Sequence, residues 1–316
     1  MGEPLAAAGA ATDRATIEIA MAVDQGFAMP LAACLASIAA THDPGECAVS
    51  VLHTGLTPAL TERIAAGLAG RVAVSWIPVN QADLAGAHFP VFLTGASLFR
   101  LLLPRMLPAG TSRTIYLDAD TVVVSSLRPL WETDLGDNLA GAVLEACAPW
   151  AAGPSGTDWR ALGLAPDAPY FNSGMLLIPL ARWRQEDIAQ HAFDVLRRTK
   201  PRWGDQCALN TALAGQWLQL PRRWNLQTAD VAGYGLAWAL WRDEVELAVA
   251  DPAVIHFTER DKPWSPGTAH PRADEWYRFL DQTSWAGWRP GDAGQPLYRK
   301  LGSRAKRAAR VLVTGS

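Results

Sequence analysis

Two carboxylates stand two residues apart where one apolar run ends and another begins. Asp118 and Asp120 follow the apolar residues 115–117 and precede Thr121 and the apolar residues 122–124. The first run predicts a buried strand, and side chains two residues apart in a strand point to the same side. Both carboxylates then face one point beyond the carboxyl end of the strand, where open α/β sheets bind ligands. A divalent cation such as Mn²⁺ or Mg²⁺ suits that point and bridges well to phosphates, whereas a pair of solvated turn aspartates is the simpler alternative.

Other short segments also carry residue types suited to chemistry. Asn172 and Gly174 stand at the start of an apolar strand, where a glycine allows a ligand to approach the backbone closely. Asp205 opens a helix, where a carboxylate can also serve only as an N-terminal charge. His256 ends a short strand; it is either a metal ligand or a structural histidine. Lys262, six residues later, can reach phosphate oxygens as a point charge.

The elements that position these residues follow an alternating pattern. Thr57 is a plausible N-cap, with Pro58 as the first helical residue. Strands over the first 120 residues alternate with helices, which predicts an α/β fold with a mostly parallel central sheet flanked by helices. A loop rich in Gly, Pro, Ala and Asp is expected at 148–170. The strands are expected at 17–23, 48–53, 72–79, 113–117, 138–144, 174–178 and 254–257, and the helices at 30–40, 58–67, 98–103, 181–198 and 205–213.

Composition limits the class of protein. The chain has 316 residues, of which 49% are hydrophobic and 19% charged, as in ordinary soluble proteins. The net charge of −3 gives no reason to expect nucleic-acid binding. Four separated cysteines, with no Cys-x-x-Cys, favour buried free thiols in a reducing compartment. Residues 1–15 lack the pattern of a secretory signal, and no apolar stretch is long enough to span a bilayer, so a cytoplasmic location is expected.

Three parts are expected along the chain. Residues 1–15 form a flexible N-terminus, 16–264 a catalytic domain, and 265–316 a Trp-rich and basic C-terminal helical extension. Basic residues near aromatic ones suit an anionic inner-membrane surface, at about 1 kcal/mol for each cation; a solvated, frayed helix is the alternative. The basic residues of the tail are Arg299, Lys300, Arg304, Lys306, Arg307 and Arg310.

The order of four segments resembles glycosyltransferase family 8, a retaining family. Residues 130–138 are also similar in sequence to the branch of bacterial lipooligosaccharide galactosyltransferases. The resemblance runs from about Ile17 to Trp264, and it implies a GT-A type fold and transfer of galactose or glucose from a UDP-sugar to a saccharide acceptor such as lipopolysaccharide or another surface glycan. The segments are Asp-x-Asp at 118–120, Phe-Asn-x-Gly at 171–174, Asp-Gln at 205–206, and His with Lys-Pro-Trp at 256–264.

The resemblance also implies roles for individual residues. Asp118, Asp120 and His256 match the ligands of a Mn²⁺ ion, with Mg²⁺ as an alternative, that bridges the two donor phosphates. Lys262 matches the lysine that binds the diphosphate. The other donor-binding positions are Ala22, Asp24 and Phe27 at the uridine, Ala119 within Asp-x-Asp, Arg100 near the donor, Asn172, Gly174, Asp205 and Gln206 around the transferred sugar, and Glu145 near sugar and acceptor.

The chain departs from the pattern of that branch at four positions. Phe27 stands in place of a tyrosine, and it keeps the stacking face without the hydroxyl. Gly26 replaces an asparagine and so removes a contact with the nucleotide. Glu259 replaces a glycine, and its carboxylate repels the diphosphate unless it turns away. Cys207 replaces an acid beside Gln206, where little effect is expected.

The residue types at these positions also favour one mechanism of sugar transfer. The departing diphosphate needs its charge neutralised, which a metal ion and Lys262 provide. Retaining glycosidases use a carboxylate nucleophile, but the matching residue here is Gln206, whose amide is a poor nucleophile. We therefore expect front-face attack, in which the departing phosphate takes the acceptor proton and Gln206, next to Asp205, stabilises an oxocarbenium-like transition state.

Two other interpretations of the carboxylate pair compete. Residues 118–122 fit the first motif of Mg²⁺-dependent phosphatases with an aspartate nucleophile. That motif normally lies on the first strand, and a later Gly-Asp-x-x-x-Asp motif is also expected. After the Gly-Asp pairs at 204–205 and 291–292, the position of the second Asp is taken by Leu209 and Pro296, respectively. A non-catalytic nucleotide-sugar-binding protein is the second alternative, for which Gly26 and Glu259 are the only indications.

Overall fold

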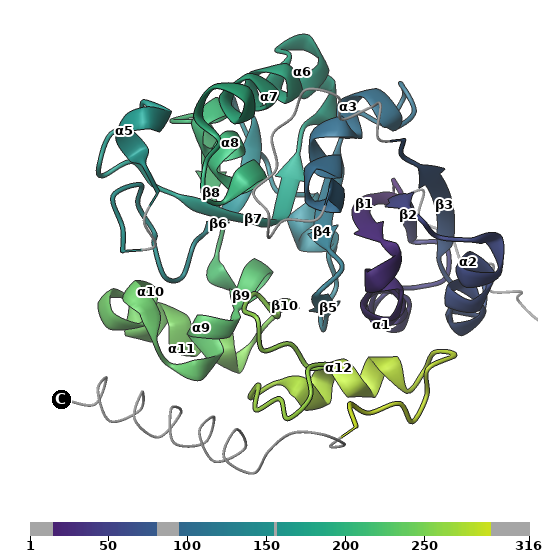
Figure 1. Ribbon diagram of the computed structural model, residues 1–316. Coiled ribbons are helices and arrows are strands. Elements are labelled where there is room, and N and C mark those ends of the chain that lie inside the picture. Colours follow the sequence, from purple (N-terminus) through teal and green to yellow (C-terminus); the bar gives the residue numbers. More distant parts are fainter. Residues whose placement is uncertain (1–14, 81–94, 155–156, 292–316) are drawn as a thin grey trace, which may run out of the picture.

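The computed structural model describes residues 15–80, 95–154 and 157–291 (Figure 1). The strands are β1 (Ile17–Asp24), β2 (Cys47–Thr54), β3 (Ala73–Pro78), β4 (Thr114–Asp118), β5 (Thr121–Val123), β6 (Ala140–Leu144), β7 (Phe171–Ile178), β8 (Trp217–Gln219), β9 (Leu226–Gln227) and β10 (Val254–His256). The α-helices are α1 (Ala28–Thr41), α2 (Pro58–Ala65), α3 (Leu103–Met106), α4 (Arg128–Trp131), α5 (Trp159–Leu162), α6 (Leu180–Gln185), α7 (Ile188–Thr199), α8 (Gly204–Ala212), α9 (Thr228–Ala232), α10 (Gly235–Leu240), α11 (Arg242–Ala250) and α12 (Ala273–Leu280). The 3₁₀ helices are η1 (Gln25–Phe27), η2 (Ala66–Leu68), η4 (Gly95–Leu102) and η5 (Arg222–Asn225).

The main sheet has seven strands in the order β3-β2-β1-β4-β7-β6-β8. β1 pairs in parallel with β2 and β4, as β2 does with β3 and β6 with β8. Only β7 among these strands runs antiparallel to its neighbours, β4 and β6. A smaller sheet has the order β5-β10-β9. The structure therefore confirms the predicted α/β fold with a mostly parallel sheet.

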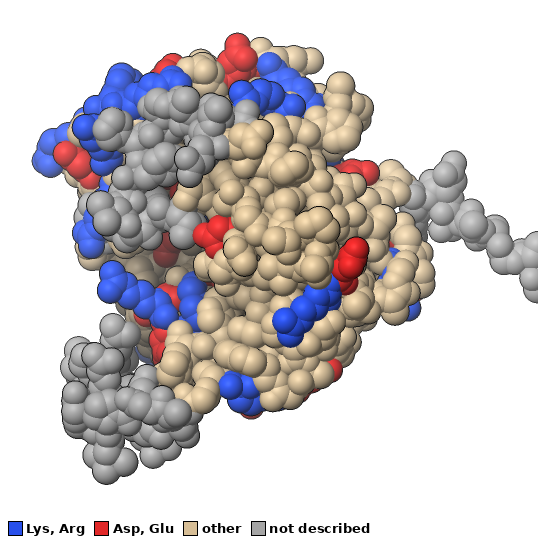
Figure 2. Space-filling model, turned by 45° about the vertical axis from the view of Figure 1, so that its right-hand side comes forward, with Lys and Arg blue, Asp and Glu red and all other residues tan. Residues whose placement is uncertain are grey.

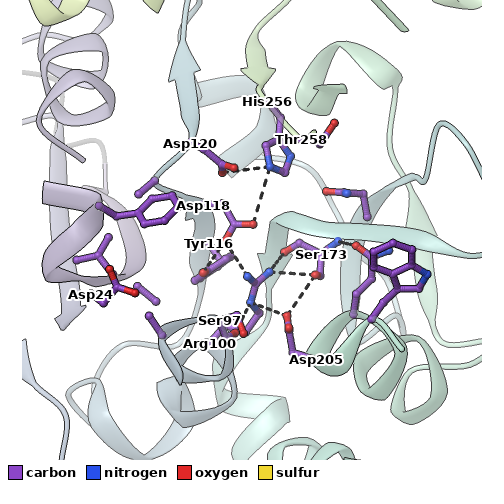
Figure 3. Close-up of a pocket in the computed structure, with 18 of the residues that line it drawn as sticks. Asp24, Ser97, Arg100, Tyr116, Asp118, Asp120, Ser173, Asp205, His256 and Thr258 are labelled. Atoms are coloured by element: carbon purple, nitrogen blue, oxygen red, sulfur yellow. Dashed lines mark hydrogen bonds and ion pairs between the residues drawn. The ribbon is translucent and has the colours of Figure 1, made fainter. Parts of the chain in front are cut away.

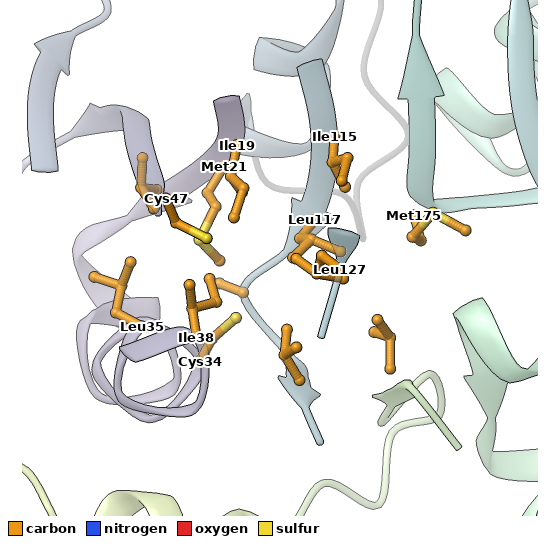
Figure 4. Packing of buried hydrophobic residues seen from close by; sticks show 14 of the residues in the cluster. Ile19, Met21, Cys34, Leu35, Ile38, Cys47, Ile115, Leu117, Leu127 and Met175 are labelled. Carbon is orange, nitrogen blue, oxygen red and sulfur yellow. The ribbon is translucent and has the colours of Figure 1, made fainter. Parts of the chain in front are cut away.

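Helices cover both faces of the main sheet, because the apolar side chains of β1 point alternately to one face and to the other. Ile19 and Met21 point to one face, where they join Leu35 of α1 and Leu117 of β4 (Figure 4). Ala20 belongs to the cluster on the other face, beside α7 and α8. Figure 1 shows α6, α7 and α8 on one side of the sheet and α1 and α12 on the other. Burying each large apolar side chain contributes roughly 1.5–3 kcal/mol, which holds the layers together.

Two helices begin at residues whose side chains cap them. Pro58 begins α2, and the Thr57 hydroxyl accepts a hydrogen bond from the Leu60 amide at 3.3 Å, as predicted. Asp24 ends β1 and caps η1, because its Oδ1 accepts a hydrogen bond from the Gly26 amide at 2.9 Å. The chain therefore turns sharply at the carboxyl end of β1.

The predicted helix at 181–198 is wrong as a single element. The chain breaks it at Asp187, which has a left-handed φ of 50°. The position of α6 is fixed by contacts outside it, since the Trp183 indole donates to the Leu139 carbonyl at 2.6 Å and Arg182 donates to the Asp137 carbonyl at 2.6 Å. The break lets α7 start in a new direction and pack against α8.

Two further predictions need correction. The helix expected at 98–103 is the 3₁₀ helix η4, followed by the short α3. Pro104 lacks the N–H that an α-helix would donate to the Arg100 carbonyl, so α-helical pairing starts only with α3, in whose first turn Pro104 lies. The expected loop at 148–170 contains the short helix α5. The strand expected from residue 174 already begins at Phe171, so Asn172 lies within β7.

The described part of the C-terminal extension packs on the domain. Trp276, Phe279 and Leu280 of α12 are buried in one cluster with Ala33 and Ala36 of α1. Residues 1–14 and 292–316, and with them the basic tail residues, lie outside the described residues. Among the described helices, none combines the length and the apolar character needed to cross a membrane.

The charges on the surface are mixed in sign, and the cysteines form no disulfide. On the face drawn in Figure 2, Lys and Arg gather toward the upper left and are interspersed with Asp and Glu. All four cysteines are free, as predicted; Cys34, Cys47 and Cys207 are buried, and Cys147 is half-buried.

Candidate functional site

The polar residues predicted from the sequence meet at one edge of the sheet. Ala22 of β1 lies beside Asp118 of β4, and Leu117 pairs with Met175 of β7. A cavity of about 430 Å³ opens at this edge (Figure 3). Its lining includes Ala22, Asp24, Phe27, Arg100, Asp118, Ala119, Asp120, Asn172, Asp205, Gln206, His256 and Lys262, which were all predicted from the sequence.

Three potential metal ligands converge in this cavity. Asp118 ends β4, Asp120 lies in the turn before β5, and His256 ends β10, which pairs with β5. One ligand atom from each side chain lies within 4.8 Å of the other two. His256 Nε2 is 3.2 Å from Asp120 Oδ1 and 3.9 Å from Asp118 Oδ2. Two carboxylates and an imidazole suit Mn²⁺, so the donor set fits the predicted ion.

Gly174 forms the wall behind these ligands. A Cβ at this position would lie 2.0 Å from Cε1 of His256 and 2.8 Å from Oδ2 of Asp118. No side chain fits in that space. The glycine in the Phe-Asn-x-Gly strand therefore permits the imidazole and the carboxylate to approach the backbone of β7.

Arg100 links the three potential metal ligands to another carboxylate, that of Asp205. Its guanidinium lies 2.7 Å from Oδ1 of Asp118 and 3.0 Å from Oδ2 of Asp205, over the ring of Tyr116. The Tyr116 hydroxyl donates to the same Asp118 Oδ1 at 2.8 Å. Burial lowers the pKa of Arg100, but Asp118 and Asp205 outweigh it and hold that pKa above its ordinary value. Asp118 therefore uses one oxygen to hold Arg100 and Tyr116, and its other oxygen faces His256 (Figure 3).

The pKa values of two buried aspartates are shifted in opposite directions. Burial raises the pKa of Asp205 to about 6, although Arg100 acts in the opposite direction. Burial also favours the neutral form of Asp120, but Lys262 and His256 outweigh it and hold the pKa of that carboxyl well below its usual range. Lys262 Nζ lies 2.6 Å from Asp120 Oδ2. Asp120 is therefore charged at neutral pH, as a metal ligand must be.

A set of amides and a carboxylate lies on the other side of the cavity. The Gln206 side chain accepts a hydrogen bond from the Ser173 amide at 3.2 Å and donates to Glu145 Oε2 at 3.3 Å. Asn172 donates to the same Glu145 oxygen at 2.9 Å. Glu145 does not line the cavity itself but fixes Asn172 and Gln206, which do. These residues offer hydrogen-bonding groups suited to sugar hydroxyls.

Of the four positions that depart from the family pattern, Phe27 and Glu259 line the cavity. Glu259 lines it, and its carboxylate accepts a hydrogen bond from the Tyr234 hydroxyl. That bond reduces the repulsion expected toward a diphosphate, since it directs one carboxylate oxygen toward Tyr234. Phe27 packs edge-on against Trp264, with ring centroids 6.1 Å apart. Its ring is thereby held at the cavity wall.

Several residues of the site were not predicted from the sequence. Tyr116, Ser173, Trp203 and Thr258 line the cavity, and the buried Asn225 contacts His256 from behind. Tyr116 stands two residues before Asp118, and the same i, i+2 rule that groups Asp118 with Asp120 could have found it. No local pattern marks Asn225.

The fold and the sequence both have known relatives. The family model described as glycosyl transferase family 8 matches residues 18–267. General stress protein A of Bacillus subtilis (strain 168) is 25% identical over 277 residues, which is 85% of this chain and 94% of that protein. Lipopolysaccharide 1,2-glucosyltransferase of Escherichia coli (strain K12) is 27% identical over 201 residues, which is 63% of this chain and 57% of that protein.

A solved structure extends the likeness to three dimensions. The galactosyltransferase LgtC, in complex with donor and acceptor sugar analogues, superposes with a TM-score of 0.74 and 29% sequence identity. The match covers 84% of this chain and 96% of LgtC. The fold is thus of the GT-A glycosyltransferase type.

The chain belongs to glycosyltransferase family 8, whose model matches most of its length. It is a glycosyltransferase rather than a phosphatase with an aspartate nucleophile or a non-catalytic binding protein. The position of the Asp pair agrees, because β4 is preceded by three other strands of the main sheet.

Proposed function

We propose that this protein is a Mn²⁺-dependent, retaining hexosyltransferase that moves galactose or glucose from a UDP-sugar to a saccharide acceptor. The observation that carries the proposal is the convergence of Asp118, Asp120 and His256 in one cavity with Lys262. Carboxylate and imidazole ligands beside a lysine form a site that suits a metal-bound diphosphate.

Asp118, Asp120 and His256 would hold the ion. When bound, Mn²⁺ neutralises negative charge that develops on the departing diphosphate. Lys262 Nζ lies 2.6 Å from Asp120 Oδ2, so its ammonium stands beside a proposed metal ligand. It adds a second positive charge toward the leaving group.

The residues around the sugar support transfer with retained configuration. Gln206 is poorly suited to act as a nucleophile, because its amide is neutral and its oxygen already accepts from the Ser173 amide. Asp205 is buried, and its Oδ2 is held by Arg100 at 3.0 Å. We therefore propose front-face attack, in which the acceptor proton passes to the departing phosphate and Gln206 stabilises positive charge on the sugar. A trapped glycosyl adduct on Gln206 or Asp205 would overturn this route.

The acceptor is proposed from the relatives. Two of the matching proteins, from Escherichia coli and Salmonella typhimurium, are named as lipopolysaccharide glycosyltransferases. A surface glycan or a lipid-linked saccharide is therefore the acceptor class that we propose. The choice between galactose and glucose depends on contacts to one epimeric hydroxyl.

The experiment is UDP release from a panel of UDP-sugars. The assay uses the wild type and Asp120→Ala, each with Mn²⁺ and then with excess chelator, and p-nitrophenyl phosphate serves as a second substrate. We expect release from one hexose donor, lost with chelator and in the variant. UDP release that persists in chelator would contradict the proposed metal dependence. Release of phosphate from p-nitrophenyl phosphate without UDP release would contradict the proposed transfer of a hexose.

A further inference from the structure

We propose that Asn225 is a positioning residue that fixes the tautomer of His256 and so sets the affinity of the cavity for its metal ion. The inference rests on the proposed metal site and concerns a residue outside the cavity lining. Asn225 ends η5, is fully buried, and precedes β9, which pairs in parallel with β10. That pairing brings the Asn225 side chain next to the His256 ring, where its Oδ1 lies 2.9 Å from Nδ1.

The orientation of the Asn225 amide is set by a chain of hydrogen bonds that begins at the backbone. The Gly174 amide donates to Asn172 Oδ1 at 3.0 Å, and a backbone N–H can only donate. Asn172 Oδ1 is therefore an acceptor, and its Nδ2 donates to Glu145. Asn225 Nδ2 donates to the same Asn172 Oδ1 at 2.9 Å. The oxygen of Asn225 must then face the histidine.

An oxygen facing Nδ1 decides where His256 carries its hydrogen. The amide oxygen of Asn225 only accepts, so Nδ1 carries the hydrogen. Nε2 is the other ring nitrogen, and it faces Asp118 and Asp120 at 3.9 and 3.2 Å. Its lone pair is then the one available to a cation held by both carboxylates. Metal-bound histidines are generally held through their other nitrogen in this way, and loss of the partner costs 10–100-fold in affinity.

The test uses three variants of the full chain. Asn225→Ala removes both contacts of the amide. Asn225→Asp keeps an oxygen that accepts from Nδ1 and loses the donor to Asn172. Asn225→Ser has a side chain too short to reach the ring, and it replaces the alanine variant if that one does not fold. The buried Asn210, whose side chain binds the Phe171 backbone and the Gln206 carbonyl, provides the matched control Asn210→Ala.

The measurement is Mn²⁺ affinity, followed by the electron paramagnetic resonance signal of the free ion in the presence of UDP. We expect Asn225→Ala or Asn225→Ser to bind Mn²⁺ about 10–100-fold more weakly than the wild type, and Asn225→Asp and Asn210→Ala to bind within a fewfold of it. Long-range ¹H–¹⁵N spectra of the protein with diamagnetic Mg²⁺ should show His256 protonated at Nδ1 in the wild type and Asn225→Asp.

Each other outcome is decisive. Equal weakening in Asn225→Asp and Asn225→Ala would mean that the amide acts through Asn172 and would overturn the inference. Unchanged affinity in all Asn225 variants, or a wild-type His256 protonated at Nε2, would overturn it as well. Failure of the wild type to bind Mn²⁺ is a distinct result, because it would overturn the proposed metal site and with it the role of Asn225.

Discussion

Among the single residues of the site, Gly174 is the most tightly constrained. Its neighbours leave no space for a methyl group, since an added Cβ would lie 2.0 Å from the His256 ring. The glycine is therefore required by the side chains that face it. This constraint connects the backbone of β7 to the geometry of the proposed metal ligands.

Replacing Gly174 should damage the site. Gly174→Ala forces the His256 ring away from Asp118, and we expect a stability loss of about 1–3 kcal/mol from overpacking. UDP release should fall about 10–100-fold because a ligand is displaced. Activity assays and thermal unfolding measure the two effects.

Gly110→Ala is the matched control for this substitution, because nothing lies within 4 Å of a Cβ at Gly110. It should leave both activity and stability near the wild-type values. A Gly174→Ala variant with the same activity as Gly110→Ala would contradict the account of the wall behind His256.

Individual residues differ in how far the sequence could predict them. Asp118 and Asp120 were accessible to physical reasoning, because they stand at i and i+2 beside an apolar run. His256 lies far along the chain, and only the family resemblance joined it to that pair. Asn225 was missed because it enters the site through the pairing of β9 with β10, which leaves no mark in the local sequence.

Among the elements, the segment that leads into α12 ties the C-terminal part to the domain. His270 is buried, and its Nε2 lies 3.1 Å from the hydroxyl of Thr228 in α9. Its ring packs against Phe257 just after β10, with centroids 4.8 Å apart. The C-terminal segment therefore covers the same strand that carries His256.

This contact predicts a pH dependence of stability. Burial, then Lys262 and Arg272, lower the pKa of His270 to about 4 in the folded protein, against 6.5 for a free histidine. The unfolded chain therefore takes up a proton below pH 6.5 that the folded chain refuses. The stability from neutral His270 is present above pH 6.5 and is lost as the pH falls toward 4. Between pH 7 and pH 5 the loss is about 2 kcal/mol.

The measurement is urea unfolding at pH 7 and pH 5 of the wild type and His270→Gln. Burial raises the pKa of Asp205 and of Asp230 to about 6, so these groups favour the folded state as the pH falls and oppose His270. The comparison between the two proteins removes their contribution. His270→Gln should lose about 2 kcal/mol less than the wild type on going to pH 5, and an equal change in both would refute the prediction.

The helices also differ in how far local sequence patterns could predict them. The capped start of α2 at Thr57 and Pro58 was predicted correctly because both signals are local. The break at Asp187 was not, because α6 is positioned by contacts to residues 137–139 that lie far away in sequence. Tertiary contacts therefore override a continuous helical pattern.

For the molecule as a whole, the basic C-terminal tail bears on where the protein acts. Residues 299–310 contain basic side chains and no acidic one. We propose that they contact the anionic inner membrane, so that the cavity works close to a lipid-linked acceptor.

Deleting residues 299–316 tests that proposal. The truncated chain should bind less to vesicles with anionic lipids than the full chain does, and added salt should weaken the binding of the full chain. A variant with Arg304, Lys306, Arg307 and Arg310 changed to glutamine retains the chain length and should behave like the deletion. Vesicle binding that is unchanged in both variants would rule out electrostatic docking by the tail.

We propose that Asp118, Asp120 and His256 hold the ion that receives the donor diphosphate. Diffraction from crystals grown with Mn²⁺ and UDP, measured at the manganese absorption edge, would locate the ion. We expect an anomalous peak between these three side chains, with the diphosphate of UDP on the ion and near Lys262. UDP bound in the cavity with no peak at these residues, or with the ion held elsewhere, would contradict it.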